Sequence, residues 1–203
     1  MDLNLRSRLD KEDIRELIVQ ERYYRDTWQW EKLRACYHPE ASQTRVAVTW
    51  IDDSIDDFIG AAKQLSDWGE NPFHAIMPAV IHIRGDKSVV ESKCSIQLRL
   101  PEEEGEYDFT SQVRLVSRVE RLQGGIWKLL SVETIYEQDS MVPTGPVPGL
   151  LPYFKANNRR SSYKHLCWLL ERRGFDVRSD LPGTDIPETV EREMKRHFTW
   201  LEE

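Results

Sequence analysis

The chain has 203 residues, which fits one domain with an appended segment or two small domains and excludes a large multidomain enzyme. It carries 28 Lys and Arg residues against 35 Asp and Glu residues, for a formal net charge of −7, and has no long basic run. A nucleic acid is therefore excluded as an expected partner, because binding its phosphate backbone needs a basic surface. Aromatic residues make up 10% of the chain, enough to build the core of a globular protein.

The sequence has no apolar stretch of signal-peptide or membrane-spanning length. We therefore expect a cytoplasmic protein that does not contact a membrane. The three cysteines, Cys36, Cys94 and Cys167, are widely spaced and form neither a CxxC motif nor a metal-ligand pattern with histidine. This spacing predicts reduced thiols that pack as small apolar side chains.

Helical patterns fill the first 75 residues. Residues 10–13 resemble a capping arrangement, and apolar residues follow at helical spacing, which predicts a first helix that begins near Asp10. The pattern weakens at Asp26, which predicts a break there and a second helix beyond it. A third helix is predicted from a cap at residues 54–57 to a stop at Gly69.

From residue 77 the apolar pattern changes to a period of two. It predicts strands over residues 77–83, 90–98, 107–121 and 127–136, joined by turns that contain glycine. The order of these segments predicts a meander of four long antiparallel strands. Helices that precede strands favour an α+β fold, in which the helices cover the apolar face of a curved antiparallel sheet.

The segment after the last strand is rich in proline and glycine. Residues 143–152 hold four prolines (143, 146, 148 and 152) and two glycines (145 and 149), a composition that cannot form a helix or a central strand. We therefore divide the chain into a main domain over residues 1–142, a linker over 143–152 and a C-terminal helical extension over 153–203. Two amphipathic helices are predicted in the extension, one that ends at Gly174 and one that begins with a capping box at residues 185–188. We expect the extension to pack on the main domain or on another subunit.

Several local strings carry a resemblance to a known family. They are YYRDTW at residues 23–28, WEKLRACYHPEA at residues 30–41, His74, and GIWK at residues 125–128. In order and spacing, residues 8 to about 140 resemble the SnoaL-like and scytalone dehydratase-like members of the nuclear-transport-factor-2-like superfamily. The resemblance implies a cone-shaped α+β barrel with helices packed on a curved sheet. It also implies a homo-oligomer, dimer or trimer, in which the C-terminal segment often closes the cavity.

The resemblance also implies a catalytic pair. In the dehydratases and in the related hexachlorocyclohexane dehydrochlorinase, an Asp at the end of the first helix and a His just before the sheet act together, and Asp26 and His74 fall on these positions. The dehydrochlorinase also has a Lys on its first helix and an Arg on its last strand. At the corresponding places this chain has the sequences QER (residues 20–22) and LSVE (residues 130–133), which do not match that pair of cations. Scytalone dehydratase has a Tyr beside its Asp, where this chain has Arg25. The reactions of those particular enzymes are therefore not predicted here.

An Asp–His pair can catalyse proton transfer at a carbon next to a carbonyl. Histidine, with a pKa of about 6.5, is the side chain best suited to accept a proton near neutral pH, and a carboxylate fixes its tautomer and stabilises the imidazolium. We therefore predict a cofactor-independent lyase or isomerase, of dehydratase or cyclase type, that acts on a small apolar polyketide-like or terpenoid-like substrate, with His74 as the base and Asp26 as its partner. The chain lacks the motifs of a nucleophile elbow, a phosphate-binding loop and a zinc protease, so we expect neither a cofactor nor a metal ion.

Aromatic and hydroxyl side chains near this pair in the predicted topology are candidates to contact the substrate and its enolate. The predicted substrate-binding residues are Tyr24, Trp28, Tyr37, Trp50, Ser111 and Tyr136. The candidate donors to the enolate are Tyr24, Tyr37, Ser111 and Tyr136 of this set, together with Arg25 and Gln112.

Each of these interpretations has an alternative. Asp26 also fits a helix N-cap, His74 fits a solvated loop, and aromatic residues commonly pack in cores. Three further histidines, His38, His165 and His197, are expected on the surface. At the level of function, the alternatives are a non-catalytic ligand-binding or interaction module of the same fold, and an epoxide hydrolase-like activity, which needs an Asp-Arg-Asp set around a water.

Overall fold

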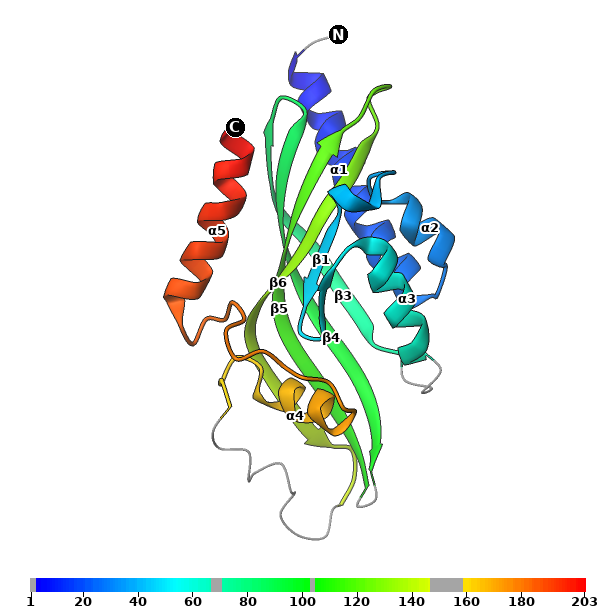
Figure 1. The fold of residues 1–203 in the computed structure, drawn as a ribbon, viewed down its shortest axis with the longest axis vertical. Helices are drawn as coiled ribbons and strands as arrows, with labels where there is room; N and C mark the ends of the chain where they lie inside the picture. Colours follow the sequence, from blue (N-terminus) through cyan, green and yellow to red (C-terminus); the bar gives the residue numbers. More distant parts are fainter. Residues whose placement is uncertain (1–2, 67–70, 103–104, 147–158) are drawn as a thin grey trace.

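The computed structural model describes residues 3–66, 71–102, 105–146 and 159–203, which form an α+β fold (Figure 1). Its centre is a curved, unclosed sheet of six strands in the order β2-β1-β6-β5-β4-β3. The strands are β1 (Arg45–Val48), β2 (Ile51–Asp53), β3 (Phe73–Arg84), β4 (Lys87–Glu102), β5 (Gly105–Arg121) and β6 (Trp127–Pro143). The α+β class and the curved sheet are thus confirmed, and in the described residues the sheet does not close on itself.

The four long strands form the predicted antiparallel meander. β3 pairs with β4, β4 with β5 and β5 with β6, all antiparallel. The sequence pattern did not reveal β1 and β2, because four and three residues are too few to show an alternation. β1 lies parallel to β6, which places the segment after the second helix beside the last strand of the meander, with β2 at the edge of the sheet.

The last strand is longer than the sequence pattern indicated. β6 continues to Pro143, which pairs with Tyr107 of β5, so the first residue of the predicted linker belongs to the sheet. Residues 147–152 of that linker lie outside the described residues, as does the predicted helix stop at Gly69.

Three helices precede the long strands, as predicted: α1 (Leu3–Asp26), α2 (Trp30–Ala35) and α3 (Ile55–Ser66). The expected start of α1 near Asp10 is wrong, because Asp10 does not cap the helix. Its carboxylate instead accepts hydrogen bonds from Arg121 (2.7 Å) and Trp127 (3.3 Å), which lie far away in the sequence. The predicted cap of α3 is confirmed, since the backbone N–H of Asp57 donates to the Ser54 hydroxyl at 3.2 Å.

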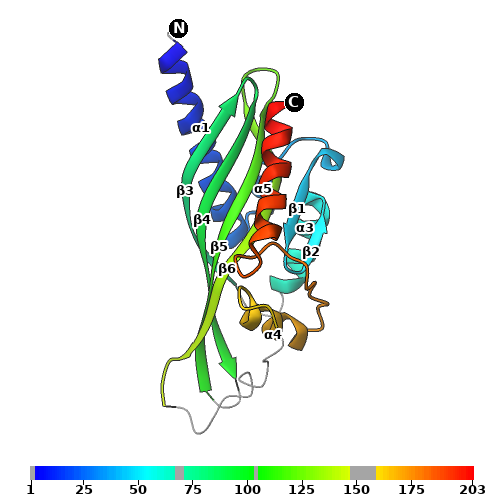
Figure 2. The same cartoon turned by 90° about the vertical axis from the view of Figure 1, so that its left-hand side faces the viewer.

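The C-terminal extension contains α4 (Lys164–Arg172) and α5 (Pro187–Glu202), and both pack on the main domain. The two helices lie on different faces of the sheet. Leu166, Leu169 and Leu170 of α4 join the core that α1 and α3 share, whereas Leu201 of α5 packs on a second core. Figure 2 shows α5 running along the face of the sheet that it covers.

Adjacent strand residues confirm this separation. Val89 and Val116 pack with α5, while their neighbours Val90 and Leu115 belong to the main core, and successive side chains of a strand point to opposite faces. The capping box predicted at the start of α5 is wrong. The Asp185 carboxylate instead accepts hydrogen bonds from Arg160 and Ser162, and the N-cap residue of the helix is Ile186, which makes no capping hydrogen bond.

The cysteines agree with the expectation drawn from their spacing. Cys36, Cys94 and Cys167 are all buried free thiols. Across the described ranges, no helix combines the length and the apolar character that crossing a membrane requires.

Candidate functional site

A cavity of about 120 Å³ lies between the helices and the concave side of the sheet. Its volume is similar to that of the apolar cavity of roughly 150 Å³ that holds a benzene molecule in another protein, so it suits a compound with a single ring. Most of its wall is apolar, and α4 contributes part of it. The apolar residues that line it include Trp28, Val48, Trp50, Phe58, Ile96, Leu98, Leu115, Leu166, Leu169 and Leu170.

Asp26 and His74 meet at this cavity although 48 positions separate them in the sequence. Asp26 is the last residue of α1, and His74 is the second residue of β3 and lines the cavity. One carboxylate oxygen of Asp26 accepts the backbone N–H of His74, and the other lies 2.7 Å from Nδ1 of the imidazole. The two side chains are only 13% and 8% exposed.

This geometry bears on the alternatives drawn from the sequence. Asp26 does not cap the next helix, because the N-cap of α2 is Gln29 and no side chain caps it. His74 does not lie in a solvated loop, since it is a residue of β3 and its side chain is mostly buried.

The electrostatic surroundings favour an ionised aspartate beside a neutral histidine. Burial raises the pKa of Asp26, but the hydrogen bonds and charge of His74 outweigh burial, so the pKa of this carboxyl lies below its usual 3.8. Burial lowers the pKa of His74 below its usual 6.5, and the cations Arg22 and Arg25 act in the same direction against the effect of Asp26. A neutral imidazole next to a carboxylate carries its proton on Nδ1, which leaves the lone pair of Nε2 free to accept a proton.

Two buried arginines, Arg22 and Arg25, line the same cavity. The sequence suggested Arg25 only as one of several candidate donors to the enolate and suggested no role for Arg22. Arg22 forms a bidentate ion pair with its neighbour Glu21, whose carboxylate also accepts the Tyr37 hydroxyl at 2.8 Å. Arg25 lies beside Asp26, with 3.7 Å between the guanidinium and the carboxylate. A signal was present in the sequence, since residues 22, 25 and 26 share one face of a helix by their spacing.

Three of the six predicted substrate-binding residues line the cavity: Trp28, Trp50 and Tyr136. The Tyr136 hydroxyl lies 2.5 Å from the Thr49 hydroxyl, and burial raises the pKa of this tyrosine above its usual 10.0. Trp28 has a positive φ of 58°, in the region that follows the end of a helix, and this backbone conformation places its ring at the cavity.

The other three predicted residues do not line this cavity. Tyr37 is fully buried and directs its hydroxyl at Glu21, and Tyr24 packs between Tyr23 and the ammonium of Lys32. Ser111 is fully buried in β5, four residues along the strand from the cavity residue Leu115. Whether these side chains reach the cavity depends on how the helices pack and on how far along the strand each residue lies. Neither can be predicted from the local sequence.

The expectation that the remaining histidines lie on the surface is wrong for two of them. His38 and His197 are buried, and His197 is 0% exposed. His165, partly buried, lies beside Asp139, with 3.0 Å between Nδ1 and the carboxylate. None of the three lines the cavity.

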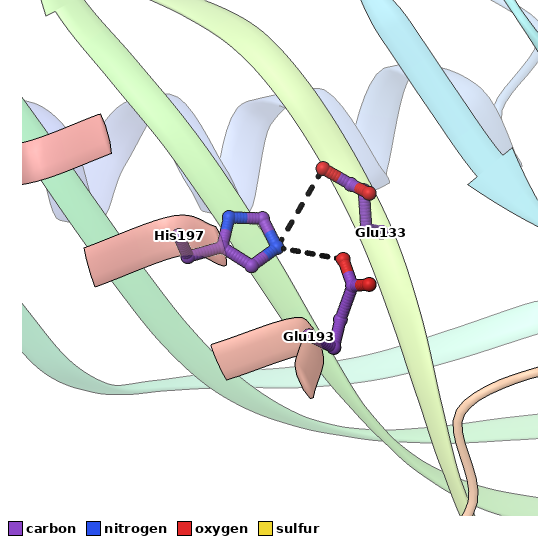
Figure 3. A group of neighbouring side chains, drawn as sticks. All are labelled: Glu133, Glu193 and His197. Carbon is purple, nitrogen blue, oxygen red and sulfur yellow. Dashed lines mark ion pairs between the residues drawn. The ribbon is translucent and has the colours of Figure 1, made fainter. Parts of the chain in front are cut away.

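His197 belongs to a cluster with Glu133 and Glu193 that has the residue types of a metal site (Figure 3). Its Nε2 lies 3.5 Å from a Glu133 oxygen and 3.3 Å from a Glu193 oxygen. The surroundings do not fit a cation, because Arg196 already contacts both carboxylates. The Nε–H of Arg118 donates to Nδ1 of His197 at 3.2 Å, so Nε2 is the ring nitrogen that faces the carboxylates. The cluster is therefore an ion network that holds α5 on the sheet.

Comparison with known proteins agrees with this fold. The SnoaL-like domain matches residues 6–133, which is more than half of the chain. The chain belongs to the SnoaL-like family. Among solved structures, this SnoaL-like protein is similar to a putative scytalone dehydratase from Novosphingobium aromaticivorans, at 15% identity and a TM-score of 0.54 over 72% of this chain and 94% of that one. It is also similar to a hexachlorocyclohexane dehydrochlorinase, at 14% identity and a TM-score of 0.57 over 73% of this chain and 98% of that one.

The sequence relatives are fungal. Pea pathogenicity protein 2 of Fusarium vanettenii is 29% identical over 201 residues, covering 95% of this chain and 84% of the relative. An uncharacterized protein of Emericella nidulans is 30% identical over 186 residues, covering 86% of this chain and 76% of the relative. The match to the Fusarium protein extends well beyond residue 133, so this SnoaL-like protein shares most of its C-terminal extension with that relative.

Proposed function

We propose that this protein is a cofactor-independent acid–base catalyst that removes a proton from a carbon next to a carbonyl group in a small, largely apolar, single-ring substrate. The observation that carries the proposal is the contact between the buried Asp26 carboxylate and Nδ1 of His74, at the wall of an apolar cavity. The family and its neighbours in structure include proteins named as dehydratases and dehydrochlorinases, which supports a reaction of this class.

Each residue has one task in the proposed reaction. Nε2 of His74 accepts the proton from the substrate carbon, and the electron pair of the broken C–H bond forms the enolate. Asp26 holds the imidazole through Nδ1 and stabilises the imidazolium that results. If the imidazolium returns the proton to a leaving hydroxyl group, water departs and the reaction is a dehydration, and if it returns the proton to another carbon, the reaction is an isomerisation.

The size and character of the cavity support the choice of substrate. Trp28, Trp50 and the leucines of α4 give apolar contact to a ring, and they keep water away from the imidazole. Because a low-polarity site strengthens electrostatic interactions, the neighbouring charges act on the enolate more strongly than they would in water.

Proton exchange in heavy water tests the proposal without knowledge of the natural substrate. The protein is incubated with a panel of single-ring ketones, some of them with a hydroxyl group on the β-carbon, and NMR follows deuterium uptake at the α-carbon and loss of water. We expect the wild type to catalyse exchange or dehydration of at least one compound. His74→Gln is expected to abolish this activity.

His165→Gln is the matched control, because His165 also contacts an aspartate but does not line the cavity. Full activity of the His74→Gln protein, with its fold intact by circular dichroism, would reject the mechanism. Binding of the ketones without any catalysed exchange would favour the alternative, a ligand-binding module.

A further inference from the structure

Arg25 is a buried cation whose hydrogen-bonding capacity is mostly unused. Its side chain is 8% exposed and lines the cavity next to the Asp26–His74 pair. A guanidinium has five N–H donors. Among the described residues, Arg25 makes one long hydrogen bond, 3.4 Å to the side-chain oxygen of Asn71, and one ion pair of 3.7 Å with Asp26.

Arg22 shows what a satisfied arginine looks like in the same place. It binds the carboxylate of Glu21 with two donors, and that carboxylate also accepts the Tyr37 hydroxyl. Within the part of the chain that the structure describes, Arg25 has no comparable partner, because both oxygens of Asp26 are engaged by His74. A buried charge without full hydrogen bonding is costly, and an anion in the cavity would remove that cost.

The charge on Arg25 persists at neutral pH although its surroundings oppose it. Burial, together with the positive charge of Arg22, lowers the pKa of Arg25 to about 10. Arg25 therefore presents a permanent, weakly partnered positive charge to the cavity, beside a neutral base.

We infer that Arg25 binds the carbonyl oxygen of the substrate and holds the negative charge that develops there when His74 removes the proton. This inference rests on the proposed function and names its substrate class as ring carbonyl compounds that bind through an enolate oxygen. The geometry carries it, since the guanidinium lies 3.7 Å from the same Asp26 oxygen that lies 2.7 Å from Nδ1 of His74, and both Arg25 and His74 line the cavity. In an enolate, the charged oxygen lies two bonds from the carbon that lost the proton, so one site must offer a base and a cation close together.

Two single-ring ligands of similar shape test the inference by binding alone. Dimedone is ionised to its enolate at mildly alkaline pH, whereas dihydroisophorone is a neutral ketone. We expect NMR titration of the wild type to give at least about tenfold tighter binding of the dimedone enolate, the gain that one charge-assisted hydrogen bond supplies. Arg25→Gln is expected to remove this preference while binding of dihydroisophorone changes little.

Two further variants complete the test. Lys32→Gln removes one positive charge outside the cavity and is expected to keep the preference, which controls for the change in net charge. His74→Gln is also expected to keep the preference for the enolate. The inference about Arg25 is tested by binding and the proposed function by deuterium exchange, so either one can fail while the other holds.

Equal binding of the two ligands by the wild type would overturn the inference, as would an undiminished preference in Arg25→Gln. If Arg25→Gln does not fold, Arg25→Lys replaces it, because lysine keeps the charge but loses the planar pair of donors. Weaker binding of the enolate with unchanged binding of the ketone supports the inference in that variant, and unchanged binding of both ligands contradicts it.

Discussion

The molecule holds two histidines by the same contacts and places them in different surroundings. Asp26 accepts the backbone N–H of His74 at 2.7 Å and lies 2.7 Å from Nδ1, and Asp139 accepts the backbone N–H of His165 at 2.8 Å and lies 3.0 Å from Nδ1. Asp139 also accepts the N–H of Leu166 at 2.8 Å, so it caps the start of α4 from a neighbouring strand. His74, in contrast, faces a cavity with two buried arginines.

The difference shows that a carboxylate–imidazole contact does not by itself define a base. In the Asp139–His165 pair the contact fixes a helix end, and that helix supplies Leu166, Leu169 and Leu170 to the cavity wall. In the Asp26–His74 pair the same contact leaves one edge of the imidazole at the cavity. We therefore expect the Asp139–His165 pair to govern stability and the Asp26–His74 pair to govern reaction rate.

Substitution of each histidine by glutamine is expected to give the largest difference in reaction rate between the two pairs. His74→Gln should lower the exchange rate by about 10²–10⁴-fold, the usual contribution of a general base. His165→Gln should leave the rate close to that of the wild type, because His165 does not line the cavity. The NMR exchange assay measures both rates, and a similar loss in the two variants would contradict the distinction between the pairs.

The two aspartates give the next contrast. Asp26→Asn should lower the exchange rate by on the order of 10²-fold or more, because an amide can donate to Nδ1 and so place the ring proton on Nε2. Asp139→Asn should instead lower the free energy of unfolding by about 1–3 kcal/mol, the cost of weakening a buried hydrogen-bonded group. Urea denaturation and the exchange assay separate the two effects, and a stable but inactive Asp139→Asn protein would reverse the assignment.

The pH dependence of exchange tests the state of His74. Only a neutral imidazole accepts a proton, so the rate should rise with pH through the pKa of His74 and then stay level. Because burial and the neighbouring arginines lower this pKa, the midpoint should lie below 6.5. Arg25→Gln removes one of these cations and should move the midpoint upward by a fraction of a unit. A midpoint above 6.5 in the wild type would show that Asp26 dominates instead.

A change in α4 should have the smallest effect. Leu169→Val removes one methylene group from the cavity wall, at an expected cost of about 0.5–1.5 kcal/mol in stability. It should shift ligand preference a few-fold toward larger ketones without changing the pH profile. Titration with one-ring and two-ring ketones measures the shift, and an unchanged preference would mean that α4 does not shape the cavity.

The sequence was sufficient for the main outline of the fold and for one side-chain pair. The period-two pattern located β3 to β6, and the family resemblance indicated Asp26 and His74. Contacts between distant segments were not accessible in this way. The start of α1 is one case, because Asp10 binds Arg121 instead of capping the helix.

The burial of the arginines around the cavity was not predicted, for the same reason. Arginines on a helix are ordinarily exposed, yet Arg22 and Arg25 are both buried and line the cavity. His197 likewise reads as a surface residue of α5, and only the fold brings Glu133 of β6 beside it. Local spacing predicts which residues share a face, whereas the tertiary fold decides what that face meets.

The C-terminal extension divides its two helices between opposite faces of one sheet, and the segment that joins them is fastened to β6. The backbone of Tyr136 bonds to Pro182 and Thr184, each at 2.9 Å. Residues of α4 can therefore be changed to admit a compound of different shape, while α5 stays packed on the opposite face of the sheet. The same division gives natural variants a way to alter selectivity without loosening the whole molecule.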